Sequence, residues 1–179
     1  MSGAAVTVGV APRSSSALVV ALTGPPDVRL HARTHVDLVG DDLPAQAYHA
    51  AVGLPLPEAE RLVQRWAEEA LTSAAACFAE LTEAGRVVAV GIAAVVRPVP
   101  ALDVVLRSHP LLHLAEGQLA REALAEAATR AGLPVHYLDP KGSHDPVAVE
   151  RTVALGRTAG PPWRKEHRMA ALAALAALE

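Results

Sequence analysis

Aromatic side chains are scarce in this 179-residue sequence, in which Trp, Tyr and Phe together make up 3% of the residues. So few rings provide no stacking platform of the kind that single-strand nucleic-acid binders use. The sequence has one cysteine, Cys77, which excludes an intramolecular disulfide and a metal site built from cysteine thiolates. Because Cys77 lies in an Ala-rich helical stretch, we expect a buried thiol that packs as a small apolar group.

The sequence also lacks an excess of positive charge. Its formal net charge is −3 and its pI is about 6.2, whereas a strongly electrostatic nucleic-acid binder usually has a domain pI above about 9. Fourteen of the sixteen basic residues are Arg, on an Ala-rich background that points to a GC-rich coding sequence. The abundance of Arg is therefore no evidence by itself for a nucleic-acid partner.

No apolar run is long enough to cross a membrane. The C-terminal run from Met169 to Leu178 has ten residues, and a transmembrane helix needs about 18 or more. The N-terminus has no basic region before its first apolar run, so it does not resemble a signal peptide. We expect a cytoplasmic protein without a membrane partner. With 51% hydrophobic residues, it is also expected to fold, as one domain over residues 1–179.

The apolar pattern predicts an α/β fold with a five-stranded mixed sheet flanked by helices. Alternation over residues 28–39 is typical of an edge strand with one wet face, and the continuous apolar run 87–96 is typical of a strand covered on both faces. The predicted order is β-β-β-α-β-α-β-α-α. Its segments are strands 6–10, 18–22, 28–39, 87–96 and 133–138 and helices 57–84, 110–131, 145–155 and 163–178.

This order of elements resembles the ribonuclease H-like superfamily. The residues Val8-Gly9-Val10-Ala11-Pro12-Arg13-Ser14-Ser15 resemble the opening of Holliday-junction resolvases of the RuvC type. In those enzymes a Gly-hydrophobic-Asp-Pro-Gly-Ser turn leads into a second strand. The final Ala-rich helix, which begins near Lys165 and Glu166, is also similar to their closing helix. The resemblance implies a ribonuclease H-like domain.

The same resemblance implies two divalent cations held by carboxylates from the first strand, the fourth strand and the last helix, where they stabilise phosphoryl transfer. In this sequence Ala11 stands at the position of the first-strand Asp, and residues 87–96 contain no carboxylate. Glu166 is the only residue of this sequence that corresponds to one of the expected carboxylate ligands. Because one carboxylate cannot hold two metals, we expect typical two-metal nuclease activity to be absent.

Three polar residues at the start of the predicted helix 110–131 are candidate catalytic residues: His109, His113 and Glu116. His113 and Glu116 are three residues apart and share a helix face. The set could bind a metal, or His113 and Glu116 could act as an acid–base couple. Alternatively, His109 caps the helix and His113 pairs with Glu116 at the surface. The sequence leaves these interpretations open and assigns no metal ligand and no cofactor.

The ribonuclease H-like fold would bring further residues to the same edge of the sheet, where ligands of open α/β sheets collect. These candidate ligand-binding residues are Arg13, Ser14, Arg97, Lys165 and Glu166. Guanidinium groups suit phosphate or carboxylate, although an Arg after a strand is usually just solvated. A polar loop around Lys141 could also bind phosphate, but it lacks the spacing of a phosphate-binding loop.

The sequence is compatible with three functions. The leading hypothesis is a protein that binds nucleic acid or another phosphate-bearing ligand and lacks two-metal nuclease activity. The second is an enzyme that uses His109, His113 and Glu116 on a small anionic substrate. The third is a non-catalytic interaction module that forms a homodimer. The sequence does not decide whether the protein is an enzyme.

Overall fold

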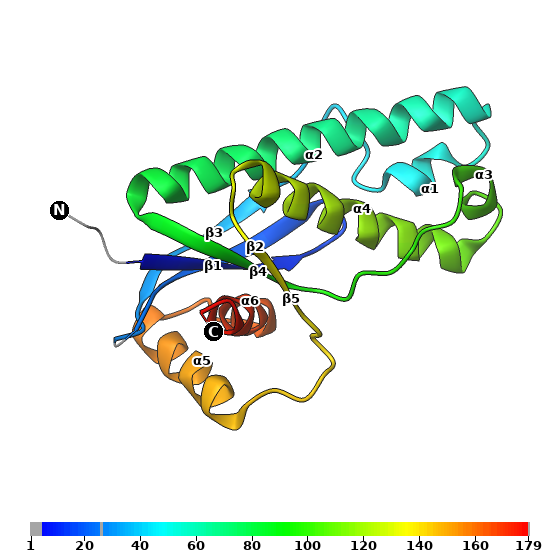
Figure 1. The fold of residues 1–179 in the computed structure, drawn as a ribbon. Helices are drawn as coiled ribbons and strands as arrows, with labels where there is room; N and C mark the ends of the chain where they lie inside the picture. The colour runs from blue at the N-terminus through cyan, green and yellow to red at the C-terminus, as the bar shows by residue number, and fades with distance from the viewer. Residues whose placement is uncertain (1–4, 26, 179) are drawn as a thin grey trace.

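The structure, a computed structural model, describes residues 5–25 and 27–178. Its centre is a five-stranded mixed sheet with the strand order β3-β2-β1-β4-β5 (Figure 1). β1 pairs antiparallel with β2 and parallel with β4, β2 pairs antiparallel with β3, and β4 pairs parallel with β5. The predicted sheet is therefore confirmed. The strands are β1 (Ala5–Pro12), β2 (Ser16–Thr23), β3 (Leu30–Asp37), β4 (Arg86–Ala93) and β5 (Val135–Leu138).

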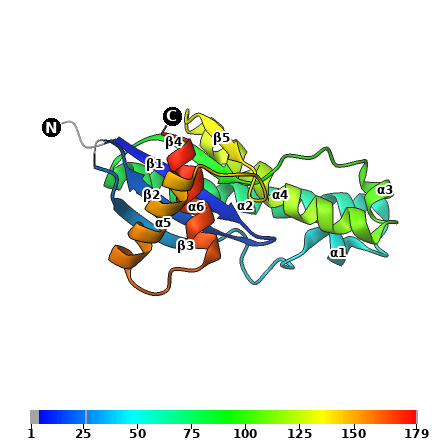
Figure 2. The same cartoon turned by 90° about the horizontal axis from the view of Figure 1, so that it is seen from below.

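Helices cover both faces of the sheet. In Figure 1, α2 and α4 lie on one side of the strands, and α6, with α5 packed against it, lies on the other. The short helices α1 and α3 lie beyond the sheet, beside the first turns of α4 (Figure 2). The helices are α1 (Ala47–Ala51), α2 (Leu56–Ala84), α3 (Leu102–Val105), α4 (His109–Arg130), α5 (Pro146–Ala159) and α6 (Lys165–Ala176).

The alternation of side chains along β1 explains the two helical layers. Because successive residues of a strand point to opposite faces, Val6, Val8 and Val10 join the core under α2 and α4, where Trp66 and Phe78 are fully buried. Ala11 points to the other face and joins a smaller core under α6. The second core is made mostly of small residues and Leu, which lets α6 approach the sheet closely.

Two glycines set the distance between α6 and the sheet. A Cβ atom on Gly9 of β1 would lie 1.7 Å from the backbone oxygen of Ala170, and one on Gly91 of β4 would lie 1.9 Å from that of Ala173. Both distances are far below ordinary contact, so the backbone of α6 rests directly on the glycines. The Ala-rich sequence of α6 gives the helix a thin face toward the strands.

The structure corrects parts of the sequence prediction. The third strand lies at the sheet edge as predicted, but Arg33 on its polar face is not simply solvated. Its guanidinium donates hydrogen bonds of 2.8, 3.2 and 2.9 Å to the carbonyl oxygens of Gly160, Pro161 and Pro162, which connect α5 to α6. The short helices α1 and α3 were not predicted, because four or five residues carry too little periodicity to register.

Among residues 5–25 and 27–178, no helix is both long and apolar enough to cross a membrane.

Candidate functional site

Two adjoining hollows lie at the edge of the sheet where the parallel strands β1, β4 and β5 end. His113 and Arg121 of α4 line both hollows. The first, of about 220 Å³, is formed by the β1–β2 turn and α4, and its lining includes Arg13, Ser14 and Glu116. The second, of about 360 Å³, lies between α4 and the segments that follow β4 and β5, and its lining includes Arg97, Asp139 and Lys141.

The second hollow is rich in positive charge. Arg121 is half-buried, and its guanidinium donates a hydrogen bond of 3.1 Å to the carbonyl oxygen of Val95. Burial, and to a smaller extent the nearby charge of Arg97, lower the pKa of Arg121. Arg97 and Lys141 are exposed. We call the set Arg97, Arg121 and Lys141 the basic edge.

One carboxylate accompanies the basic edge. Asp139 lines the same hollow, and its Oδ1 accepts the backbone N–H of Lys141 at 2.8 Å. Its acceptor role in this turn fixes the loop that presents the Lys141 side chain. One acid against three basic groups leaves the hollow with a net positive charge, which suits an anionic ligand.

The turn after β1 is joined to the start of α6 by an ion pair. Nη2 of Arg13 lies 3.0 Å from Oε1 of Glu166. Glu166 accepts a backbone hydrogen bond from its own N–H, and this bond and the hydrogen bond from Arg13 lower the pKa of the carboxyl. The helix N-terminus and the guanidinium therefore both stabilise the ionised form of Glu166.

The residues at this edge do not fit the carboxylate-bound metal pair that the family resemblance implies. Ala11 stands near the end of β1, and β4 leads into Ala93 and Ala94. The carboxylate of Glu166 is already paired with Arg13. Among residues 5–25 and 27–178, no cluster of three or more carboxylates is poised around a common point.

Three histidines lie together at the N-terminal end of α4. The ring centroids of His109 and His113 are 4.5 Å apart, those of His49 and His113 are 4.8 Å apart, and those of His49 and His109 are 6.0 Å apart. One nitrogen from each ring lies within 4.8 Å of the other two. His109 and His113 are one helical turn apart on α4, and α1 brings His49 beside them.

Glu116 lies underneath this histidine cluster and is 2% exposed. Its Oε1 accepts the backbone N–H of His49 at 2.9 Å and lies 3.2 Å from His49 Nδ1. Its Oε2 is buried and has no hydrogen-bond partner among the described residues. The interpretation of His113 and Glu116 as a surface pair is wrong, because Glu116 is buried and bonds to His49 instead.

The interpretation of His109 as the N-cap of this helix is also wrong. Ser108 is the N-cap residue of α4 and makes no side-chain cap hydrogen bond, while His109 is the first helical residue. The ring of His109 is thus free to lie beside His113, the geometry expected one turn apart on a helix.

The structure brings most of the predicted site residues to neighbouring positions. Arg13, Ser14, His113 and Glu116 line the first hollow, and Arg97 lines the second. The remaining residues lie outside the linings of both hollows: His109 belongs to the histidine cluster, Glu166 pairs with Arg13, and Lys165 is exposed at the start of α6.

Sequence reasoning missed His49 and Arg121. A signal for Arg121 was present, since His109, His113, Gly117 and Arg121 follow at intervals of four residues and so form one stripe of α4. No comparable signal exists for His49, because only the packing of α1 against α4 brings it to the cluster.

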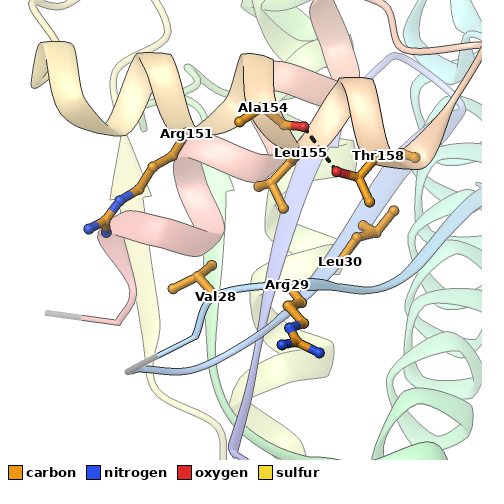
Figure 3. A pocket seen from close by; sticks show the side chains of 8 residues that line it. Val28, Arg29, Leu30, Arg151, Ala154, Leu155 and Thr158 are labelled. Atoms are coloured by element: carbon orange, nitrogen blue, oxygen red, sulfur yellow. Dashed lines mark hydrogen bonds between the residues drawn. The ribbon is translucent and has the colours of Figure 1, made fainter.

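A third hollow, of about 450 Å³, lies between β3 and α5 on the other side of the sheet (Figure 3). Apolar side chains, including Val28, Leu30 and Leu155, form much of its wall. The guanidinium groups of Arg29 and Arg151 point away from each other in Figure 3, and Arg29 pairs with Asp27. This hollow therefore lacks the convergent charge of the basic edge.

No protein-family model and no curated protein sequence matches the chain. Two solved structures from Thermus thermophilus are similar to it in fold. RuvC in complex with a Holliday junction substrate has a TM-score of 0.54 at 17% identity, and a second RuvC structure has a TM-score of 0.52 at 18% identity. Each comparison covers 95% of this chain and 90% of the other. The chain therefore has a ribonuclease H-like fold of the RuvC kind.

Proposed function

We propose that the protein binds the phosphate groups of a nucleic acid, or of another phosphate-bearing ligand, at the basic edge and lacks two-metal nuclease activity. The observation that carries this proposal is the presence of Arg97, Arg121 and Lys141 around one hollow at the end of the parallel strands. A RuvC structure with this fold is described in complex with a Holliday junction substrate. That similarity favours nucleic acid among the phosphate-bearing ligands.

The three basic residues differ in what they offer a phosphate. Arg121 is half-buried and its guanidinium is hydrogen-bonded to the carbonyl of Val95, so it is a fixed group in the lining of the hollow. Arg97 and Lys141 are exposed, and their side chains make no hydrogen bond to a described residue. They can therefore reach a ligand that extends beyond the hollow. A guanidinium can donate two parallel hydrogen bonds to a phosphate, and a lysine acts as a point charge.

Contacts to phosphate groups position the protein on a nucleic acid and supply affinity, whereas contacts to bases supply sequence preference. The hollow offers charge, none of the residues that line it is a Trp, Tyr or Phe, and the chain is poor in aromatic residues. We therefore expect binding that depends on nucleic-acid shape and phosphate placement, with little preference for base sequence.

The ion pair between Arg13 and Glu166 supports the second half of the proposal. The Glu166 carboxylate at the start of α6 is already paired with the Arg13 guanidinium, and Ala11 of β1 has no side-chain group that could bind a metal. The enzyme hypothesis and the homodimer hypothesis remain predictions without an observation that favours either over binding.

Fluorescence anisotropy with a labelled four-way DNA junction, a matched duplex and a single strand tests the proposal. Arg97→Ala and Lys141→Ala should each weaken binding severalfold. Arg86→Ala is the matched control, because Arg86 is exposed at the opposite end of β4 and should leave binding unchanged. Equal losses in all three variants, or no binding of any DNA or of inorganic phosphate by the wild type, would contradict the proposal.

Incubation of the same DNA substrates with the protein and Mg²⁺ or Mn²⁺ tests the absence of nuclease activity. No cleavage product is expected at protein concentrations that saturate the DNA. Cleavage that follows the protein through purification and is lost in Glu166→Gln would show that a metal-dependent site exists at this edge.

A further inference from the structure

We propose that His49, His109 and His113 form a zinc-binding site with Glu116 as its positioning residue. The inference is independent of phosphate binding at the basic edge. It rests on three imidazole groups from two helices whose nitrogens lie within 4.8 Å of one another. Within the described part of the chain, this is the one group of three His, Cys, Asp or Glu side chains close enough to share a metal ion.

The distances require only a small adjustment. Zinc binds imidazole nitrogen at about 2.0–2.1 Å in tetrahedral geometry, which places the ligand nitrogens about 3.4 Å apart. His109 and His113 are exposed, so their rings are able to rotate toward a common point at little cost. His49 is half-buried and already oriented by its hydrogen bonds.

Glu116 orients His49 in the manner common in zinc proteins. A carboxylate that accepts the N–H of one imidazole nitrogen fixes the tautomer and leaves the other nitrogen to bind the metal. Here Oε1 of Glu116 faces His49 Nδ1 at 3.2 Å, so Nε2 is the nitrogen available to zinc. The same oxygen also holds the His49 backbone N–H, which fixes α1 as well as the ring.

The buried carboxylate is itself an argument for a nearby cation. Glu116 is 2% exposed, and its Oε2 has no partner among the described residues. An ionised carboxylate in such a place is costly unless positive charge compensates it. A zinc ion bound through His49 supplies that charge.

Imidazole ligands also determine the class of metal. They favour zinc and neighbouring transition metals over Mg²⁺, which prefers oxygen ligands. Three protein ligands leave a fourth zinc position for water or an anion. Because His113 also lines both hollows, a zinc ion bound by His113 would lie close to the basic edge.

Zinc titration of the untagged, metal-free 179-residue chain tests the proposal, with a chromophoric chelator as competitor and Mg²⁺ as a parallel titrant. We expect one zinc per chain, no comparable Mg²⁺ binding, and the visible spectrum of a tetrahedral site when Co²⁺ replaces zinc. Half a zinc per chain with dimer formation, or zinc binding no tighter than that of Mg²⁺, would overturn the intrachain site.

Variants separate a ligand from a bystander. Glu116→Gln keeps the shape of the side chain and should weaken zinc binding about 10–100-fold, and His113→Ala should weaken it more. His35→Ala, at an exposed histidine of β3, is the matched control and should have no effect. Circular dichroism of each metal-free variant checks the fold. A folded His113→Ala variant that binds zinc as well as His35→Ala would overturn the proposal.

Discussion

Replacement of Gly9 by alanine tests the packing on which the candidate site depends. The new Cβ would lie 1.7 Å from the carbonyl oxygen of Ala170 and 2.7 Å from its carbonyl carbon. Real Cβ atoms essentially never approach another heavy atom more closely than 3.0 Å. The helix α6 and β1 must therefore separate by at least 1.3 Å at this point, the difference between 3.0 and 1.7 Å.

The obstacle is helix backbone, which cannot rotate aside as a side chain does. Overpacking of a core typically costs about 1–3 kcal/mol, and we place Gly9→Ala at the upper end, near 3 kcal/mol. In a protein of this size each kcal/mol lowers Tm by about 2–4 °C, so a fall of about 6–12 °C is expected. Displacement of α6 should also separate Glu166 from Arg13.

Thermal and urea unfolding followed by circular dichroism provide the measurement. Gly24→Ala is the matched control, because a Cβ there would meet its nearest atoms at 3.5 Å, an ordinary contact. A Gly9→Ala variant within about 0.5 kcal/mol of Gly24→Ala, the usual range for surface substitutions, would refute the direct seating of α6 on the sheet.

Three further predictions concern other parts of the molecule. Arg33→Ala removes the donor for three carbonyl oxygens of the α5–α6 connection and should lower the free energy of unfolding by about 2 kcal/mol in urea titrations; an unchanged midpoint would contradict this role. Burial raises the pKa of Cys77 to about 11, so its thiol should resist a disulfide reagent at pH 8 in the native protein and react fully in denaturant; rapid native labelling would show that the thiol is accessible. Arg13→Ala should raise the carboxyl pKa of Glu166, observed by NMR, only part of the way to its ordinary value, because a backbone hydrogen bond also lowers it. Because folding lowers the carboxyl pKa of Glu166, the ion pair stabilises the protein at pH values above the Glu166 pKa of the unfolded chain. This contribution is lost as the pH falls through the Glu166 pKa of the folded protein. An unchanged Glu166 pKa in the variant would show that the pair does not form in solution.

The sequence predicted the sheet because strong local patterns encode it. Strand 28–39 alternates and lies at the edge, whereas strand 87–96 is continuously apolar and lies inside the sheet between β1 and β5. Its last three residues do not belong to β4, since hydrophobic periodicity alone does not mark where pairing with neighbours ends.

The candidate site was harder to predict because its groups meet through tertiary packing. The position of Arg97 and Arg13 at one edge follows from the fold, and the structure places both beside α4. The partner of Glu116 was missed because it comes from α1, 67 residues earlier in the chain. Helical spacing indicates which residues share a face of α4, but it does not indicate which other element packs against that face.

The salt dependence of DNA binding tests the central claim most directly. If Arg97, Arg121 and Lys141 each neutralise one phosphate of a duplex, a plot of log K against log salt concentration should have a slope of about −2.7, from about −0.9 per phosphate. Lys141→Ala should reduce its magnitude by about 0.9, to about −1.8, and Arg86→Ala should leave it unchanged. A slope near zero in the wild type, or the same slope in the wild type and Lys141→Ala, would contradict phosphate binding at the basic edge.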